Sequence, residues 1–120
     1  MRALVALLAV TAVTATAQAD FTPLAGRYTG HDRSGAYAIA FGFTRHPHPE
    51  VYNFRVTHRG HANTFFTSTP FHGRHFYFHT SEGEVEIYGE WVGASIVEGW
   101  MKLDGTHTHH FRMDLDIPNP

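Results

Sequence analysis

Cysteine is absent from this 120-residue chain, and lysine occurs only once, at Lys102. Without cysteine no disulfide can form, so a small domain has to rely on its apolar core for stability. Charged residues make up 17% of the chain, with nine Lys and Arg against eleven Asp and Glu. This mildly acidic balance argues against nucleic acid as a partner, because domains that bind nucleic acid carry a basic excess.

The motifs of common enzyme classes are also missing. The chain contains no HExxH zinc motif, no nucleophile elbow, no phosphate-binding loop and no Gly-x-Gly-x-x-Gly segment. Ser34, Ser68, Ser81 and Ser95 lack a surrounding catalytic motif, and the longest irregular stretch covers only residues 46–50. The sequence therefore predicts a non-enzymatic protein, and it indicates no organic cofactor.

The first nineteen residues have the features of a secretory signal peptide. Arg2 supplies the positive start, an apolar run covers residues 3–13, and Ala17-Gln18-Ala19 has the small-x-small pattern of a cleavage site. The apolar run is shorter than the about 20 residues that a membrane span needs, so we expect no transmembrane segment. We expect a mature chain that begins at Asp20 and is secreted or periplasmic. A small exported domain without disulfides favours a bacterial periplasm.

After residue 20, apolar residues alternate with polar or small ones, and Gly, Pro, Asp and Ser interrupt the pattern. The pattern predicts one domain, residues 20–120, with strands at about 24–31, 35–44, 51–58, 61–68, 75–80, 84–91, 95–103 and 107–117. Arg59-Gly60 and Asp104-Gly105 predict hairpin turns. Side-chain alternation places Tyr52 on the same face as Phe54, and it directs Ile117 inward.

Eight strands joined by short turns favour an all-β, antiparallel up-and-down barrel, because closure removes the open edges of the sheet. A β-sandwich is the alternative fold. An eight-stranded barrel is either filled by side chains or holds one small ligand. The chain has ten Phe, five Tyr and two Trp with which to build such an interior.

Two short segments resemble a known superfamily of barrels. Gly26-Arg27-Tyr28 resembles the Gly-x-Trp start of the calycins, which include lipocalins and avidins, although Tyr28 replaces the tryptophan. Gly89-Glu90-Trp91, followed by residues 96–101 with Gly99 among them, is similar to the late hairpins of small exported bacterial barrels of this kind. The resemblance implies an up-and-down barrel that binds a small, mostly apolar ligand inside the barrel or at its mouth. It also implies that Arg112 packs over the aromatic residue of the first strand.

The first functional hypothesis is an exported, non-enzymatic barrel that binds a small apolar or aromatic ligand. The candidate binding residues are aromatic side chains: Tyr28, Tyr37, Phe41, Phe54, Trp91 and Trp100. Another hypothesis is a structural protein with a filled core and no ligand. These two hypotheses differ in whether the barrel leaves space for a ligand.

Eleven histidines, all after residue 30, raise a further hypothesis of metal binding. His58 and His61 flank the Arg59-Gly60 turn, so a two-residue hairpin would place their Cβ atoms about 4.5–5.5 Å apart. His107 and His109 have a His-x-His spacing that places both rings on one strand face, about 6.6 Å apart. Imidazole suits Zn²⁺, Cu²⁺ and Ni²⁺, so these four histidines are the candidate ligands. The ordinary alternative is that the histidines are solvated and only titrate.

Overall fold

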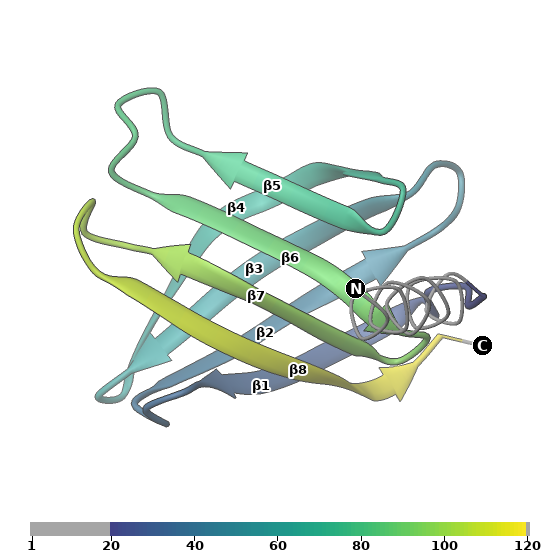
Figure 1. The fold of residues 1–120 in the computed structure, drawn as a ribbon, viewed down its shortest axis with the longest axis horizontal. Coiled ribbons are helices and arrows are strands. Elements are labelled where there is room, and N and C mark those ends of the chain that lie inside the picture. The colour runs from purple at the N-terminus through teal and green to yellow at the C-terminus, as the bar shows by residue number, and fades with distance from the viewer. Residues whose placement is uncertain (1–19, 120) are drawn as a thin grey trace, which may run out of the picture.

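The computed structural model describes residues 20–119, in which eight antiparallel strands close into an up-and-down barrel (Figure 1). The strands are β1 (Gly26–Asp32), β2 (Tyr37–Thr44), β3 (Glu50–His58), β4 (His61–His72), β5 (His75–His79), β6 (Glu86–Gly93), β7 (Ile96–Lys102) and β8 (Thr108–Pro118). Each strand pairs with the next in sequence, and β8 pairs with β1 to close the barrel. The predicted barrel is therefore confirmed, and the β-sandwich alternative is wrong.

The predicted signal peptide, residues 1–19, lies outside the described residues and stays a prediction. Within residues 20–119, no helix is long and apolar enough to cross a membrane.

The Arg59-Gly60 turn forms as its sequence predicts. Its two residues have φ angles of 52° and 80°, both in the left-handed region that two-residue hairpin turns require. The turn joins β3 to β4 and places His58 directly opposite His61.

Two bulges interrupt the predicted alternation of side chains. In β3, Asn53 has a φ of 53° and adds a residue opposite β2, so Tyr52 lies on the outer wall while Phe54 is buried inside. The prediction that Tyr52 and Phe54 share a face is therefore wrong. In β8, the pairing with β1 skips a residue between Leu115 and Ile117, and Ile117 is 55% exposed. The inward direction predicted for Ile117 is also wrong, because one extra residue reverses the side-chain direction.

Aromatic rings fill the interior of the barrel. The buried hydrophobic side chains come from all eight strands: Tyr28, Ile39, Phe41, Phe43, Val51, Phe54, Val56, Phe66, Phe71, Phe76, Ile87, Trp91, Val97, Met101, Phe111 and Met113. The centroid of the Trp91 ring lies 4.7 Å from Phe43 and 5.2 Å from Phe71, which are distances of direct ring packing. These rings occupy the space that an eight-stranded barrel otherwise leaves for a ligand.

Two glycines on neighbouring strands make room for this aromatic core. Gly89 of β6 pairs with Gly99 of β7. The Phe76 ring occupies the place that a side chain at Gly89 would take. A Cβ atom at Gly99 would collide with the Tyr88 carbonyl oxygen and would lie 2.8 Å from the Phe111 ring. The glycines of the predicted late hairpin therefore serve close packing across the barrel.

The two ends of the barrel differ. At the end on the right of Figure 1, the segment before β1 crosses the opening, and its Leu24 N–H donates to the carbonyl oxygen of Ala94 at 2.9 Å. The Arg74 guanidinium lies 4.6 Å from the centre of the Phe21 ring at the same end. The opposite end, where the Arg59-Gly60 turn and the loop after β7 lie, lacks such a crossing segment among the described residues. We call this opposite end the mouth of the barrel.

Candidate functional site

A pocket of about 320 Å³ lies at the mouth, between the β3–β4 hairpin and the residue that follows β7. Its lining has an apolar part and a polar part: Tyr37, Val56, Phe65 and Leu103 are apolar or aromatic, and His58, Arg59, His61 and Asn63 are polar. We call this site the mouth pocket. Its volume lies at the lower end of the about 300–1,000 Å³ that small-molecule pockets occupy, so it suits a compact ligand.

Phe65 reaches the mouth pocket because of a bulge in β4. Phe54 pairs with Phe66 and Arg55 pairs with Thr64, which leaves Phe65 as an extra residue without a partner in β3. Phe66 packs inside the barrel against Phe54, with ring centroids 5.3 Å apart, while Phe65 is half-buried. Two consecutive phenylalanines conflict with strict strand alternation, and this conflict is the sequence signal that could have revealed Phe65.

The Tyr37 ring is held in place at the edge of the mouth pocket. It stacks on the His58 ring with centroids 4.2 Å apart, and it lies 4.6 Å from the His109 ring. The Asp32 carboxylate accepts hydrogen bonds from the Tyr37 N–H at 3.0 Å and from the Ser34 hydroxyl at 2.7 Å. The His109 Nδ1 atom lies 3.5 Å from the same carboxylate. This network fixes the start of β2 and so preorganises one wall of the pocket.

The environment of Asp32 stabilises its charged form. Burial by itself would raise the pKa of Asp32. Its carboxylate, however, accepts hydrogen bonds from the Ser34 hydroxyl and from the backbone N–H groups of Tyr37 and Ser34, and His109 lies close to it. These interactions outweigh burial, so the pKa of Asp32 is lowered. Because the folded pKa lies below the unfolded value of about 3.9, the carboxylate stabilises the fold above that value. This stabilisation is lost as the pH falls through the folded pKa.

We expect the Asp32→Asn variant to be less stable than the wild type at pH 7, by about 1–2 kcal/mol, because hydrogen bonds to a charged acceptor are lost. The difference should shrink below pH 4, where the wild-type carboxyl group itself becomes protonated. Urea denaturation between pH 7 and pH 2 measures both effects. Asp116→Asn changes an exposed carboxylate and serves as the control. A constant difference across this pH range would contradict the assignment.

The structure distributes the six predicted ligand residues over three locations. Tyr28, Phe41, Phe54 and Trp91 lie inside the barrel and are each at most 2% exposed. The Phe41 ring stacks on Tyr28 at 5.4 Å and on Phe54 at 5.8 Å, so these side chains pack against one another. They belong to the core that supports the site.

Tyr37 and Trp100 have different positions from these four. Tyr37 lines the mouth pocket. Trp100 lies on the outer wall, where its ring stacks on Tyr88 with centroids 6.1 Å apart. The outward direction of Trp100 follows from alternation, because Glu98 and Lys102 share its face of β7.

Of the four predicted metal ligands, His58 and His61 lie together, whereas His107 and His109 lie near different carboxylates. His58 and His61 are cross-strand partners at the hairpin, and His109 lies near Asp32. His107 precedes β8, and its Nδ1 atom lies 2.7 Å from the Asp104 carboxylate. Within residues 20–119, no three side chains of the His, Asp or Glu type gather into a group that could hold a metal ion. Binding of Zn²⁺, Cu²⁺ or Ni²⁺ by these histidines stays a prediction.

Asp104 organises the loop between β7 and β8. Its carboxylate accepts hydrogen bonds from the backbone N–H groups of Thr106 and His107, each at 2.9 Å. The hydrogen bonds from the backbone and side chain of His107 are the main reason that the pKa of Asp104 is lowered. The loop that carries Leu103 to the mouth pocket is therefore locally ordered.

Arg112 does not pack over the aromatic residue of β1. Its guanidinium lies on the outer wall, 3.4 Å from the Glu98 carboxylate, whereas Tyr28 points into the barrel. The packing that the calycin resemblance implies for Arg112 is therefore wrong. The Tyr28 hydroxyl instead accepts a hydrogen bond from the Trp91 Nε1–H at 3.0 Å.

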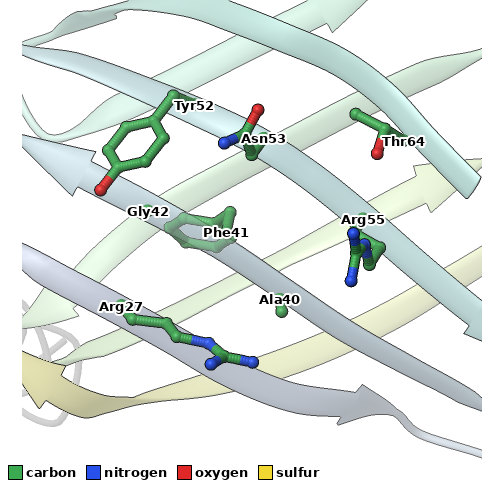
Figure 2. Close-up of a pocket in the computed structure, with 8 residues that line it drawn as sticks. All are labelled: Arg27, Ala40, Phe41, Gly42, Tyr52, Asn53, Arg55 and Thr64. Carbon is green, nitrogen blue, oxygen red and sulfur yellow. The ribbon is translucent and has the colours of Figure 1, made fainter. Parts of the chain in front are cut away.

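A second hollow, of about 410 Å³, lies on the outer wall over β2 (Figure 2). Ala40 and Gly42 form its floor, and Arg27 of β1 and Arg55 of β3 extend toward Ala40 from opposite sides. A Cβ atom at Gly42 would collide with the Tyr52 ring, so glycine allows this ring to lie across β2. The polar side chains of Arg27, Asn53, Arg55 and Thr64 border this hollow.

Comparison of the chain with known protein families, with curated proteins and with solved structures finds no match. The fold itself defines the class: a small, closed, eight-stranded up-and-down β-barrel with a buried aromatic cluster. This architecture is consistent with the resemblance to calycins. Since one fold supports many functions, the function has to be argued from the site.

Proposed function

We propose that the protein is an exported, non-enzymatic barrel that binds one small apolar or aromatic ligand in the mouth pocket. The supporting observation is the apolar lining of this pocket by Tyr37, Val56, Phe65 and Leu103. Small-molecule sites are typically concave, mostly apolar and furnished with a few polar groups, and the mouths of β-barrels are common locations for them.

The mouth is a better location for the ligand than the interior. A ligand inside the barrel would have to displace rings such as Phe41 and Trp91, which are almost fully buried and packed together. Moving such rings out of the core would lose their packing contacts, and the free-energy cost is about that of removing the same side chains by mutation. Tyr37, Phe65 and Leu103 are already partly exposed, so a ligand that covers them gains apolar burial without this cost.

Titration of the purified protein with N-phenyl-1-naphthylamine, a neutral fluorescent aromatic molecule, tests the proposal. We expect saturable binding of one molecule per chain, accompanied by increased fluorescence. Phe65→Ser should weaken this binding at least tenfold, because it removes one apolar wall of the pocket. A tenfold loss of affinity corresponds to about 1.4 kcal/mol of binding free energy. Burial of part of a phenylalanine ring can supply a free energy of this size.

Val92→Ser is the matched control, because Val92 is a large hydrophobic residue, 44% exposed, on β6 and outside the mouth pocket. Circular dichroism should show that both variants are folded. Absence of saturable binding, or an equal loss in both variants, would contradict the proposal and favour a structural role with a filled core.

A further inference from the structure

Resting on the proposed function, we infer that the ligand is a small amphiphilic anion. Its apolar ring or short chain occupies the mouth pocket, and its single anionic group is bound by Arg59 at the rim. The inference names a ligand class, which the apolar lining alone does not define. It rests on the groups that line the rim, on the lack of an ion pair for Arg59 within residues 20–119 and on the backbone conformation of Arg59.

The polar side of the mouth pocket consists of cationic or hydrogen-bond-donating groups. The polar lining residues are His58, Arg59, His61 and Asn63, and no carboxylate is among them. Two carboxylates lie near the pocket, and both already have partners. Asp32 contacts Ser34, Tyr37 and His109. Asp104, which follows Leu103, accepts hydrogen bonds from Thr106 and His107. With histidines counted as neutral, as in the formal charge of −2 for the chain, Arg59 gives this pocket lining one positive charge. An anionic group is therefore the complementary ligand group.

Arg59 is available to bind such a group. In the described part of the chain, the ion pairs involve other residues, and Arg59 takes part in none of them. Arg112, by contrast, contacts the Glu98 carboxylate on the outer wall. A guanidinium has five N–H donors in a planar arrangement that matches a carboxylate or sulfonate.

The backbone at Arg59 gives an independent reason to assign it a role. Its φ of 52° lies in the left-handed region, which is unfavourable for most side chains and which asparagine or glycine adopts more readily. Two-residue hairpin turns accordingly favour Asn-Gly, and here the second residue is indeed Gly60. Arginine at the first position therefore opposes the local preference. Such exceptions tend to occur at functional sites, where activity is retained at a cost in stability.

Two fluorescent probes with the same ring system test the inference. N-phenyl-1-naphthylamine is neutral, and 1-anilinonaphthalene-8-sulfonate differs from it by one sulfonate group. We expect the sulfonate probe to bind at least tenfold more tightly to the wild type. Arg59→Gln should abolish this preference, so the affinity for the sulfonate probe should fall at least tenfold more than the affinity for the neutral probe. Arg55→Gln is the matched control, because Arg55 lies on β3, four residues before Arg59, and lines the hollow of the outer wall. It should change neither affinity.

A second variant separates ligand binding from folding. Arg59→Asn should raise the melting temperature, because asparagine tolerates the left-handed backbone, while it also abolishes the preference for the sulfonate probe. Opposite changes in stability and affinity are not expected if Arg59 only supports the hairpin.

Each outcome leads to a decision. If neither probe binds, the proposed function fails and this inference fails with it. If both probes bind equally well, the pocket is real and the inference of an anionic ligand is wrong. If the sulfonate preference survives in Arg59→Gln, the assignment of the anionic group to Arg59 is overturned.

Discussion

Replacement of Trp91 by alanine is expected to lower the free energy of unfolding by about 3–5 kcal/mol. Trp91 is 1% exposed, and its ring packs against Tyr28, Phe43 and Phe71 at centroid distances between 4.7 and 5.4 Å. Its Nε1–H also donates to the Tyr28 hydroxyl. A domain of this size has a total stability of about 5–15 kcal/mol, so this loss would leave the barrel marginally stable or unfolded.

The other tryptophan of the chain provides the control. Trp100 is partly exposed on the outer wall beside Tyr88, so Trp100→Ala should cost no more than about 1 kcal/mol. Urea denaturation followed by far-UV circular dichroism measures both losses. Tryptophan fluorescence adds a second measurement, because the emission of the Trp100→Ala variant reports the buried Trp91 alone. Equal losses in the two variants would mean that the aromatic core is not organised around Trp91.

A single methyl group at Gly99 is expected to destabilise the barrel by about 3 kcal/mol, at the upper end of the usual cost of overpacking. The Cβ atom of Gly99→Ala would collide with the Tyr88 carbonyl oxygen, and it would lie 2.8 Å from the Phe111 ring and 2.9 Å from the Gly89 Cα. Two of these three neighbours are backbone atoms, so β6 and β7 would have to move apart.

This expectation opposes the usual effect of replacing glycine with alanine, which stabilises a folded protein where the backbone and the space allow it. Gly93→Ala, at the end of β6, is the matched control, because the nearest atoms lie 3.9 Å from the Cβ position. We expect Gly93→Ala to be neutral or to raise stability by up to about 1 kcal/mol. Thermal denaturation of the two variants measures both changes in stability. A Gly99→Ala variant as stable as the wild type would disprove the close approach of β6 and β7.

Most strands of the barrel were predictable, because side-chain alternation is a local property. Ile39, Phe41 and Phe43 alternate with small residues in β2, and all three are buried as this pattern predicts. The Arg59-Gly60 turn was predictable for a similar reason, since its conformation depends mainly on two residues. The pairing of His58 with His61 follows directly from that turn.

The bulges depended on contacts that sequence periodicity does not report. Asn53 adopts a positive φ within β3, and the direction of Tyr52 is reversed as a result. Phe65 is displaced from the regular pairing in the same way on β4. In both strands the extra residue allows neighbouring aromatic rings to pack inside a closed barrel, which is a requirement of the whole sheet.

The candidate site shows the same division between local and non-local information. Alternation, turn chemistry and the aromatic content were sufficient to predict an eight-stranded barrel and the residue types from which a site is built. The tertiary structure alone decided that the Phe41, Phe54 and Trp91 rings pack against one another and that Tyr37, Phe65 and Leu103 meet at the mouth. The reason is physical: strand formation depends on neighbours along the chain, whereas a pocket depends on how strands distant in sequence close around a shared volume.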